Sequence, residues 1–109
     1  MTNAEIAAKI AQALGLPHSP EAECWWEPGC AGFGVMLLAD GSNIFRDPWF
    51  RLCLLELGKR GRVSFGYAAK GCIERHEFEG VGWPSFDLSC PAAEFPARAL
   101  AKLMAEKCF

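Results

Sequence analysis

The sequence predicts a single α+β domain over residues 1–109, in which three helices flank a small antiparallel sheet of four to five strands. A chain of 109 residues has the length of one domain. Its apolar residues, 51% of the total, are enough to form a hydrophobic core. Segments with helical periodicity alternate with short segments of strand character, and the short connections between them favour antiparallel pairing. The predicted order is helix, two strands, helix, two or three strands, helix.

The first helix is predicted at the amino-terminal end of the sequence. Thr2 and Glu5 have the spacing of a capping box, in which each side chain binds the backbone of the other residue. Gly15 and Pro17 interrupt the periodic pattern and end the helix. Its apolar face consists of Ile6, Ile10, Ala13 and Leu14.

A hairpin over residues 23–39 is predicted to follow the first helix. Residues 24–26 form a short extended segment that is closed by Pro28 and Gly29. Residues 33–39 are a continuous apolar run that ends at a turn. A run of this length suits a buried strand better than a helix.

The second helix is predicted to begin near Asp47. Asp47 fits the N-cap position, and Pro48 fits the first helical position, where the missing N–H of proline costs nothing. Gly58 or Gly61 ends the helix among basic residues, which the helix dipole favours at this end. The apolar side consists of Trp49, Leu52, Cys53 and Leu57.

Further strands and a third helix complete the predicted fold. Val63, Phe65 and Tyr67 alternate with small residues, which is the period of a half-buried strand, and residues 72–78 pair back to them. Residues 83–88 are either a separate edge strand or a bulged continuation of the preceding strand. The last helix has an apolar stripe that consists of Phe95, Leu100, Leu103 and Met104.

Charge and hydropathy argue against two classes of partner. Eleven Lys and Arg against thirteen Asp and Glu leave a net charge of −2, which gives little electrostatic attraction to phosphates. The longest uninterrupted apolar stretch, residues 35–39, is far shorter than the roughly 20 residues of a transmembrane helix. The amino-terminal residues lack the pattern of a secretory signal. We therefore expect a cytoplasmic protein that binds neither nucleic acid nor a membrane.

The six cysteines could form disulfides, but three observations favour reduced thiols. An export signal is not found, the spacings are wide and irregular, and the apolar content is sufficient for a core. Cys53 and Cys72 also stand where a small apolar residue would serve.

A zinc site and a thiol active site are the first candidate chemistries. Cys72 and His76 fall on one face of a predicted strand and could be two zinc ligands, but no ligand pair has the spacing of a zinc knuckle. A cysteine, a histidine and Glu74 or Glu77 are a minimal nucleophilic set, without a local signature around any cysteine. The alternative is buried thiols and a hydrogen-bonded histidine. We expect no metal, no cofactor and no enzymatic activity.

Two further motifs concern phosphate and nucleic acid. Glycines at 29, 32 and 34 precede a predicted strand, whereas a phosphate-binding loop follows a strand and opens a helix. Phe65 and Tyr67 lie among basic residues, as in platforms that bind single-stranded nucleic acid, but the platform disappears if these rings face the core. The basic residues are Lys59, Arg60, Arg62, Lys70 and Arg75.

A pair of tryptophans is the candidate binding surface. Trp25 and Trp26 are consecutive, so on a strand their side chains point to opposite faces, and one is exposed if helices cover only one face. If helices cover both faces, both rings are buried. Acidic residues around the pair give an aromatic anchor with a charged rim, which is typical of a protein-binding surface. The candidate partner-binding residues are Trp25, Trp26, Glu23, Glu27, Arg60 and Arg62.

The two terminal helical segments and several features between them resemble a known family. The segments are EIAAKIAQALG at residues 5–15 and PARALAKLMAEK at residues 96–107. They enclose the aromatic hairpin near Trp25, the helix opening at residues 47–49 and the glycine-flanked Trp83. Together they resemble small bacteriophage proteins of the phage ABA sandwich domain type. The resemblance implies a phage or mobile-element origin, a place in the bacterial cytoplasm and binding to a host protein.

The expected function is therefore non-enzymatic binding to a host protein or complex, such as inhibition of a CRISPR-Cas defence complex. Residues 33–45 depart from the family, in which we expect a polar connector at this place. The alternative is a small-molecule or metal-binding α+β domain, with the aromatic residues lining a pocket. A homodimer is a third possibility, because an exposed strand at residues 83–88 could pair across a two-fold axis.

Overall fold

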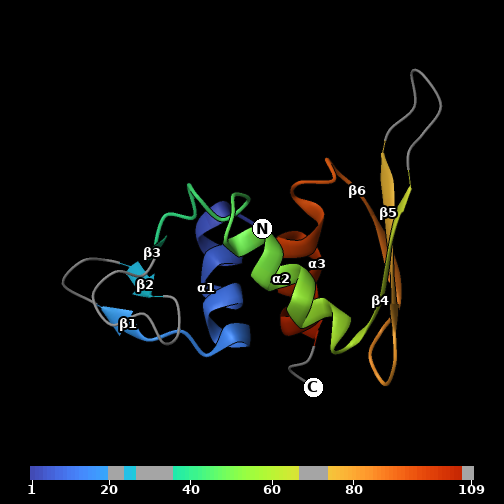
Figure 1. Ribbon diagram of the computed structural model, residues 1–109, viewed down its shortest axis with the longest axis horizontal. Helices are drawn as coiled ribbons and strands as arrows, with labels where there is room; N and C mark the ends of the chain where they lie inside the picture. The colour runs from blue at the N-terminus through green and yellow to red at the C-terminus, as the bar shows by residue number, and fades with distance from the viewer. Residues whose placement is uncertain (20–23, 27–35, 67–73, 107–109) are drawn as a thin grey trace.

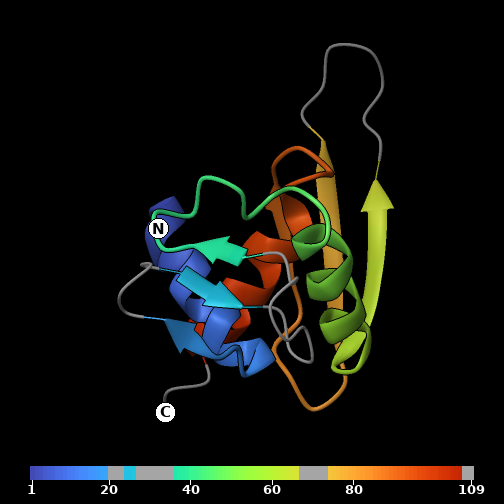
Figure 2. The ribbon, with the colours of Figure 1, turned by 60° about the vertical axis from the view of Figure 1, so that its left-hand side comes forward.

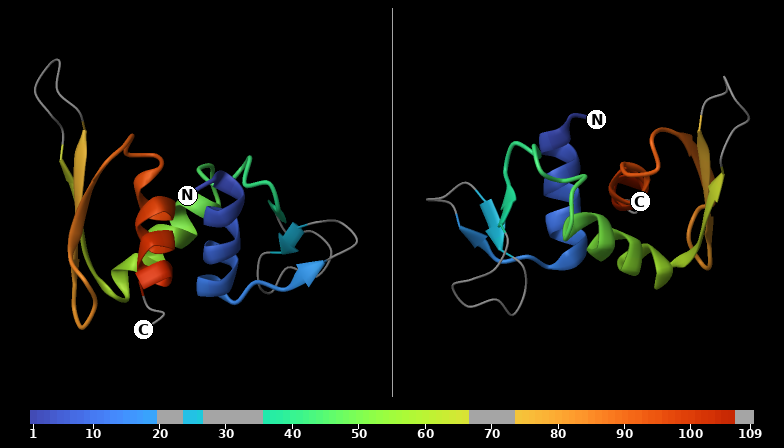
Figure 3. Two further views of the ribbon diagram at one scale, coloured as in Figure 1. Left: turned by 180° about the vertical axis from the view of Figure 1, so that it is seen from behind. Right: turned by 45° about the horizontal axis from the view of Figure 1, so that its top comes forward.

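The computed structural model describes residues 1–19, 24–26, 36–66 and 74–106, and within them the chain forms three helices and two small antiparallel sheets. The three helices lie together in a middle layer, with one sheet on each side of them (Figure 1). The views in Figure 2 and Figure 3 show the same order of layers. The α+β class and the three predicted helices are confirmed.

Helix α1 (Asn3–Leu14) begins and ends at the signals that the sequence carries. The Thr2 hydroxyl accepts a hydrogen bond from the Glu5 N–H at 3.2 Å, and the Thr2 N–H donates to the Glu5 carboxylate, so the capping box is complete. Hydrogen bonding to Thr2 lowers the pKa of Glu5. Gly15 takes a φ of 64°, which lets its N–H reach the carbonyls of the last helical turn. The buried residues of α1 are Ile6, Ala7, Ile10 and Ala11.

The first sheet consists of β1 (His18–Ser19), β2 (Cys24–Trp26) and β3 (Met36–Leu38), in that order. The predicted pairing of the second and third of these strands is confirmed, with Trp25 opposite Leu37. The predicted strand at 33–39 is observed only over β3, and residues 33–35 lie outside the described part of the chain. Leu37 is buried against the helices, which directs one face of this sheet toward the core.

The open edge of β3 is closed by a side chain. Asn43 Oδ1 accepts from the Leu38 N–H at 3.1 Å, and Asn43 Nδ2 donates to the Met36 carbonyl at 2.7 Å. These are the two kinds of backbone group that a further strand would use for pairing. Asn43 therefore takes the place of a fourth strand at this edge.

Helix α2 (Trp49–Gly58) begins differently from the prediction. The N-cap residue is Pro48, and no side chain caps the helix, so the predicted capping by Asp47 is wrong. The backbone supplies the acceptors instead, because the carbonyl of Arg46 binds the Phe50 N–H at 3.1 Å. The apolar side is largely as predicted, with Trp49, Cys53 and Leu57 buried and Leu52 half-buried.

The second sheet consists of β4 (Gly61–Gly66), β5 (Arg75–Gly80) and β6 (Phe86–Ser89), with β5 in the centre. Burial alternates along each strand: His76 and Phe78 are fully buried on the inner face of β5, whereas its outer residues are exposed. Residues 86–89 pair with β5 as a separate edge strand, so of the two alternatives for this region the edge strand is observed. The ion pairs Arg62–Glu79 and Arg75–Asp87 lie on the outer, solvent-facing side.

The single sheet of four to five strands is not observed, because the strands divide between two separate sheets. Helix α2 connects β3 to β4 and lies in the middle layer between the sheets (Figure 1). Each sheet therefore covers a different side of the helices. The helices are sandwiched between sheets, whereas the prediction had helices flanking one sheet.

Helix α3 (Phe95–Glu106) is the most buried helix, because α1 and α2 both pack against it. The predicted stripe is confirmed: Phe95, Leu100 and Leu103 have no exposed surface and Met104 is almost completely buried. Alanines at 97, 99 and 101 are buried as well, and their small side chains allow close packing of the helices. Polar residues of α3 are left on one narrow side, which becomes part of the candidate site.

Candidate functional site

Of the six candidate partner-binding residues, the structure describes the side chains of Trp25, Arg60 and Arg62. Trp25 is half-buried, packs against the core and lies with its ring centroid 5.4 Å from that of His18. Glu23, Glu27 and the side chain of Trp26 lie outside what the structure describes. The proposed acidic rim around the tryptophans therefore stays a prediction.

The two candidate arginines lie on the other side of the helical layer from Trp25, at the start of the second sheet (Figure 1). Arg60 binds Glu56 at 2.9 Å and lies over the Trp83 ring at 5.2 Å. Arg62 is exposed and pairs with Glu79 at 2.8 Å. Both guanidinium groups are therefore occupied by neighbours within the chain.

The aromatic platform for nucleic acid lacks one of its two rings. Phe65 turns inward, with ring centroids 5.3 Å from His76 and 5.9 Å from Phe95. Tyr67 lies outside the described residues. Because the Phe65 ring is half-buried and packs against the core, it does not stand free on the outer face of the sheet for stacking on a base.

His76 has a structural environment in which one nitrogen lacks a hydrogen bond. Its Nδ1 accepts from the Gly66 N–H at 3.2 Å, so the neutral ring carries its proton on Nε2. Nε2 is buried without a hydrogen-bond partner, and the nearest carboxylate oxygen, Oε2 of Glu74, is 3.6 Å away. Among the described residues no three His, Cys, Asp or Glu side chains are grouped to hold a metal ion. Cys72, the other predicted ligand, lies outside them.

Cys53 and Cys90 are in surroundings that disfavour the reactive thiolate. Cys24 and Cys53 are buried, and neither they nor Cys90 form a disulfide. Burial raises the pKa of Cys53 to about 12. Burial also raises the pKa of Cys90, although Arg98 acts in the opposite direction. A thiol with a raised pKa is a poor nucleophile at neutral pH.

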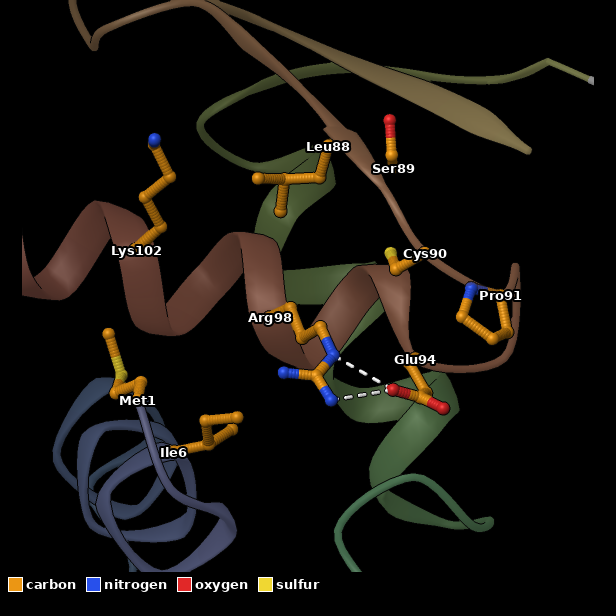
Figure 4. Close-up of a pocket in the computed structure, with 9 residues that line it drawn as sticks. All are labelled: Met1, Ile6, Leu88, Ser89, Cys90, Pro91, Glu94, Arg98 and Lys102. Atoms are coloured by element: carbon orange, nitrogen blue, oxygen red, sulfur yellow. Dashed lines mark hydrogen bonds and ion pairs between the residues drawn. The ribbon is translucent and has the colours of Figure 1, made fainter. Parts of the chain in front are cut away.

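A groove of about 530 Å³ lies over α3, between α1 and β6, and we call it the α3 groove (Figure 4). Met1 and Ile6 form one wall, at the start of α1. Leu88, Cys90 and Pro91 form the opposite wall, along β6 and the segment that follows it. Both walls are largely apolar. Binding pockets for small ligands have volumes of about 300–1,000 Å³, so the groove is large enough to hold one.

The floor of the α3 groove carries charge. Arg98 and Lys102 project from successive turns of α3, and Glu94 lies in the turn just before the helix (Figure 4). Arg98 binds one oxygen of Glu94 through Nε at 2.8 Å and through Nη2 at 2.7 Å. Lys102 lies over the Phe86 ring at 5.1 Å and is 3.7 Å from Glu106. The floor thus presents two cations, of which Lys102 has the longer and weaker ion pair.

The strand beside the groove is paired on one side. β6 is an edge strand bonded to β5, and no other described strand pairs with it. Its inner residues Phe86 and Leu88 are half-buried, whereas the inner residues of β5 are fully buried. The α3 groove therefore runs next to β6, and the backbone N–H and C=O groups on the side of β6 away from β5 face no described strand.

Sequence reasoning missed the α3 groove, although its parts were recognised separately. Residues 83–88 were predicted as a possible exposed edge, and the predicted apolar stripe of the last helix leaves Arg98 and Lys102 on its polar side. The i and i+4 spacing places the two cations on one face of a helix. The sequence does not indicate that this face lies beside the strand edge, because that depends on tertiary packing.

A second apolar surface lies at the junction of α1 and α2. It is lined by Leu14 and by leucines of α2, of which Leu55 is 60% exposed. Lys59 lies at its border. None of its described lining residues belongs to a strand, which distinguishes it from the α3 groove.

Comparison with protein-family models, with curated proteins and with solved structures finds no match to this chain. In the described part of the chain, no helix has the length and hydropathy needed to span a membrane.

Proposed function

We propose that this protein acts by stoichiometric binding to another protein and that the α3 groove receives the partner. The observation that carries the proposal is the combination of an apolar groove with an unpaired strand edge along one wall. Apolar grooves flanked by charge are a common form of peptide-recognition surface. The surroundings of the described thiols and of His76 also favour binding over nucleophilic catalysis, because none of them is exposed and activated.

The kind of partner is suggested by the family resemblance. Small lone phage domains often act by binding a host protein, so we propose a bacterial host complex as the target, with a CRISPR-Cas defence complex as the example to test. The cytoplasm of the host is then the place of action.

Affinity capture with matched variants tests this proposal. The tagged protein, a Lys102→Glu variant in the groove and a Lys59→Glu control outside it are incubated with lysate from a bacterium that carries active defence systems. Native mass spectrometry then reads the stoichiometry of each captured complex. We expect one partner, retained by the wild type and by Lys59→Glu and lost from Lys102→Glu. Absence of a stoichiometric partner, or equal capture by all three forms, would contradict the proposal.

A Leu55→Glu variant separates the two apolar surfaces. If the partner binds the surface at the junction of α1 and α2, Leu55→Glu abolishes capture and Lys102→Glu does not. Circular dichroism and thermal melting of each variant show that the fold is retained.

Binding of a small molecule is the second candidate, because the α3 groove has a suitable volume and an apolar wall opposite two cations. An amphipathic carboxylate would fit this combination. Native mass spectrometry of the purified protein would show a bound mass that Lys102→Glu removes, and no captured protein.

A further inference from the structure

We infer that the α3 groove takes an extended segment of the partner as a fourth strand on β6, and that this segment presents an apolar residue and a carboxylate two positions apart. The inference rests on the proposed function, because it specifies how a protein partner occupies the groove. Addition of a strand to a sheet edge is an established mode of peptide recognition, in which the backbone gives affinity and the side chains give specificity.

The backbone part of the inference follows from the sheet edges. β3 has a free edge that Asn43 closes with two hydrogen bonds, at 3.1 and 2.7 Å. The edge of β6 has no corresponding backbone bonds among the described residues. Natural proteins usually block or cover an exposed strand edge, and β6 instead borders an apolar hollow. An added strand would form hydrogen bonds with the free backbone groups of β6 and would also fill the α3 groove.

The side-chain part of the inference follows because the spacing of two cations along α3 is close to the spacing of two side chains on one face of a strand. Arg98 and Lys102 are four residues apart, which is about 6 Å along α3. Residues two positions apart on a strand lie on the same face and are separated by about 6.6 to 6.8 Å. Two side chains on the inner face of an added strand can therefore lie one beside Arg98 and the other beside Lys102.

The positions beside Arg98 and beside Lys102 would favour different side chains of the partner. Arg98 is held by Glu94 through two nitrogens, and the apolar side chains of Leu88 and Ile6 line the groove above and beside it. Lys102 is 38% exposed and its ion pair with Glu106 is long, at 3.7 Å. A carboxylate of the partner thus gains most at Lys102, and an apolar side chain gains most between Leu88 and Ile6.

A second copy of this chain fits the groove less well than such a segment. If two β6 strands paired, the residues that face inward would be Phe86 and Leu88, since these are the inner residues of β6. The carboxylate of this strand, Asp87, lies on the outer face and pairs with Arg75 at 3.1 Å. A second copy would therefore bring no carboxylate to Lys102.

Selection from a display library of random peptides tests the inference. Peptides of about twelve residues are long enough to form a strand of ordinary length. The wild type, Lys102→Glu and the control Lys59→Glu are immobilised and selected in parallel. We expect the wild type and the control to enrich peptides with an apolar residue and Asp or Glu at i and i+2. Lys102→Glu should lose the acidic preference and favour Lys or Arg at that position.

Backbone methylation of the best selected peptide tests strand pairing directly. Two forms are made, each with N-methyl groups on every second amide, in alternate phase. Because only every second N–H of an added strand faces β6, one form should bind at least about tenfold more weakly and the other should bind almost as the parent does. The Lys102→Glu variant should weaken the parent peptide about tenfold, since it replaces an attraction by a repulsion.

The inference is overturned by any of four results: no enriched motif, a motif with helical spacing, a motif unchanged by Lys102→Glu, or equal effects of the two methylated forms. If capture from lysate still succeeds and is sensitive to Lys102→Glu, protein binding stands and strand addition is wrong. If both experiments fail, the proposed function itself is wrong. A dimer in light scattering that Lys102→Glu disrupts would identify a second copy as the occupant and would also overturn the inference.

Discussion

Replacing Asn43 by alanine removes both hydrogen bonds that close the β3 edge. A hydrogen bond within a protein contributes about 0.5–1.5 kcal/mol to stability, so two give about 1–3 kcal/mol. The bond to Met36 is exposed and the bond to Leu38 is partly buried, so water can replace part of the loss. We therefore expect Asn43→Ala to reduce the free energy of unfolding by about 1–2 kcal/mol. Urea denaturation followed by circular dichroism measures this difference.

The matched variant is Asn43→Asp, which keeps the acceptor for the Leu38 N–H and loses the donor to the Met36 carbonyl. We expect it to be destabilised as well, because its carboxylate then faces that carbonyl without a proton between them. Asn43→Ala should also associate more readily at high concentration, as dynamic light scattering would detect, because the edge of β3 becomes open. A change in stability below about 0.3 kcal/mol for Asn43→Ala, with no added association, would refute the role given to this side chain.

Three further outcomes are expected. Gly41→Ala should reduce the free energy of unfolding by more than about 2 kcal/mol, because Gly41 has a φ of 75° and an added Cβ would meet the backbone of Asn3. Gly82 has the same φ but open space around it, so Gly82→Ala should reduce the free energy of unfolding by only about 1 kcal/mol, and urea denaturation measures both changes. The Cys53 thiol should resist alkylation in the native protein at pH 8 and react once the chain is unfolded, because its pKa of about 12 keeps it protonated. Detection of alkylated Cys53 by peptide mapping of the native protein would contradict this prediction. Leu57→Ala should lower stability by about 2–5 kcal/mol, since Leu57 is fully buried, and a loss below about 1 kcal/mol in calorimetry would show that the site collapses around the smaller side chain.

Local sequence signals predicted most of the individual elements. The capping box of α1, its glycine stop and the apolar stripe of α3 depend on residues close together in the chain, so their pattern is visible in the sequence. The start of α2 was mispredicted because Asp47 and Pro48 fit a common pattern, whereas the backbone carbonyl of Arg46 accepts the Phe50 N–H instead. A local pattern predicts that a helix begins, and the path of the preceding turn decides which group caps it.

The candidate site was less predictable than the elements. Trp25 and the two arginines at 60 and 62 were chosen because of their residue types, but the structure places them on opposite sides of the helical layer. Phe65 is at a position that alternation alone could assign to either face, and its ring packs against Phe95 of a helix that begins thirty positions later. Contacts between residues this far apart leave no periodic trace in the sequence.

The sequence by itself determined the α+β class, the three helices and the buried stripe of α3, because composition and periodicity fix which surfaces must leave water. It determined the buried face of α1 in part, since Ile6 and Ile10 are buried as predicted, whereas Ala13 and Leu14 are half-buried. Only the tertiary structure decided that the strands form two sheets on opposite sides of the helices. It also decided that Arg98 and Lys102 lie beside the open edge of β6. The physical reason is that strand pairing and helix packing join segments distant in the chain, and which edges meet depends on the packing of the whole core.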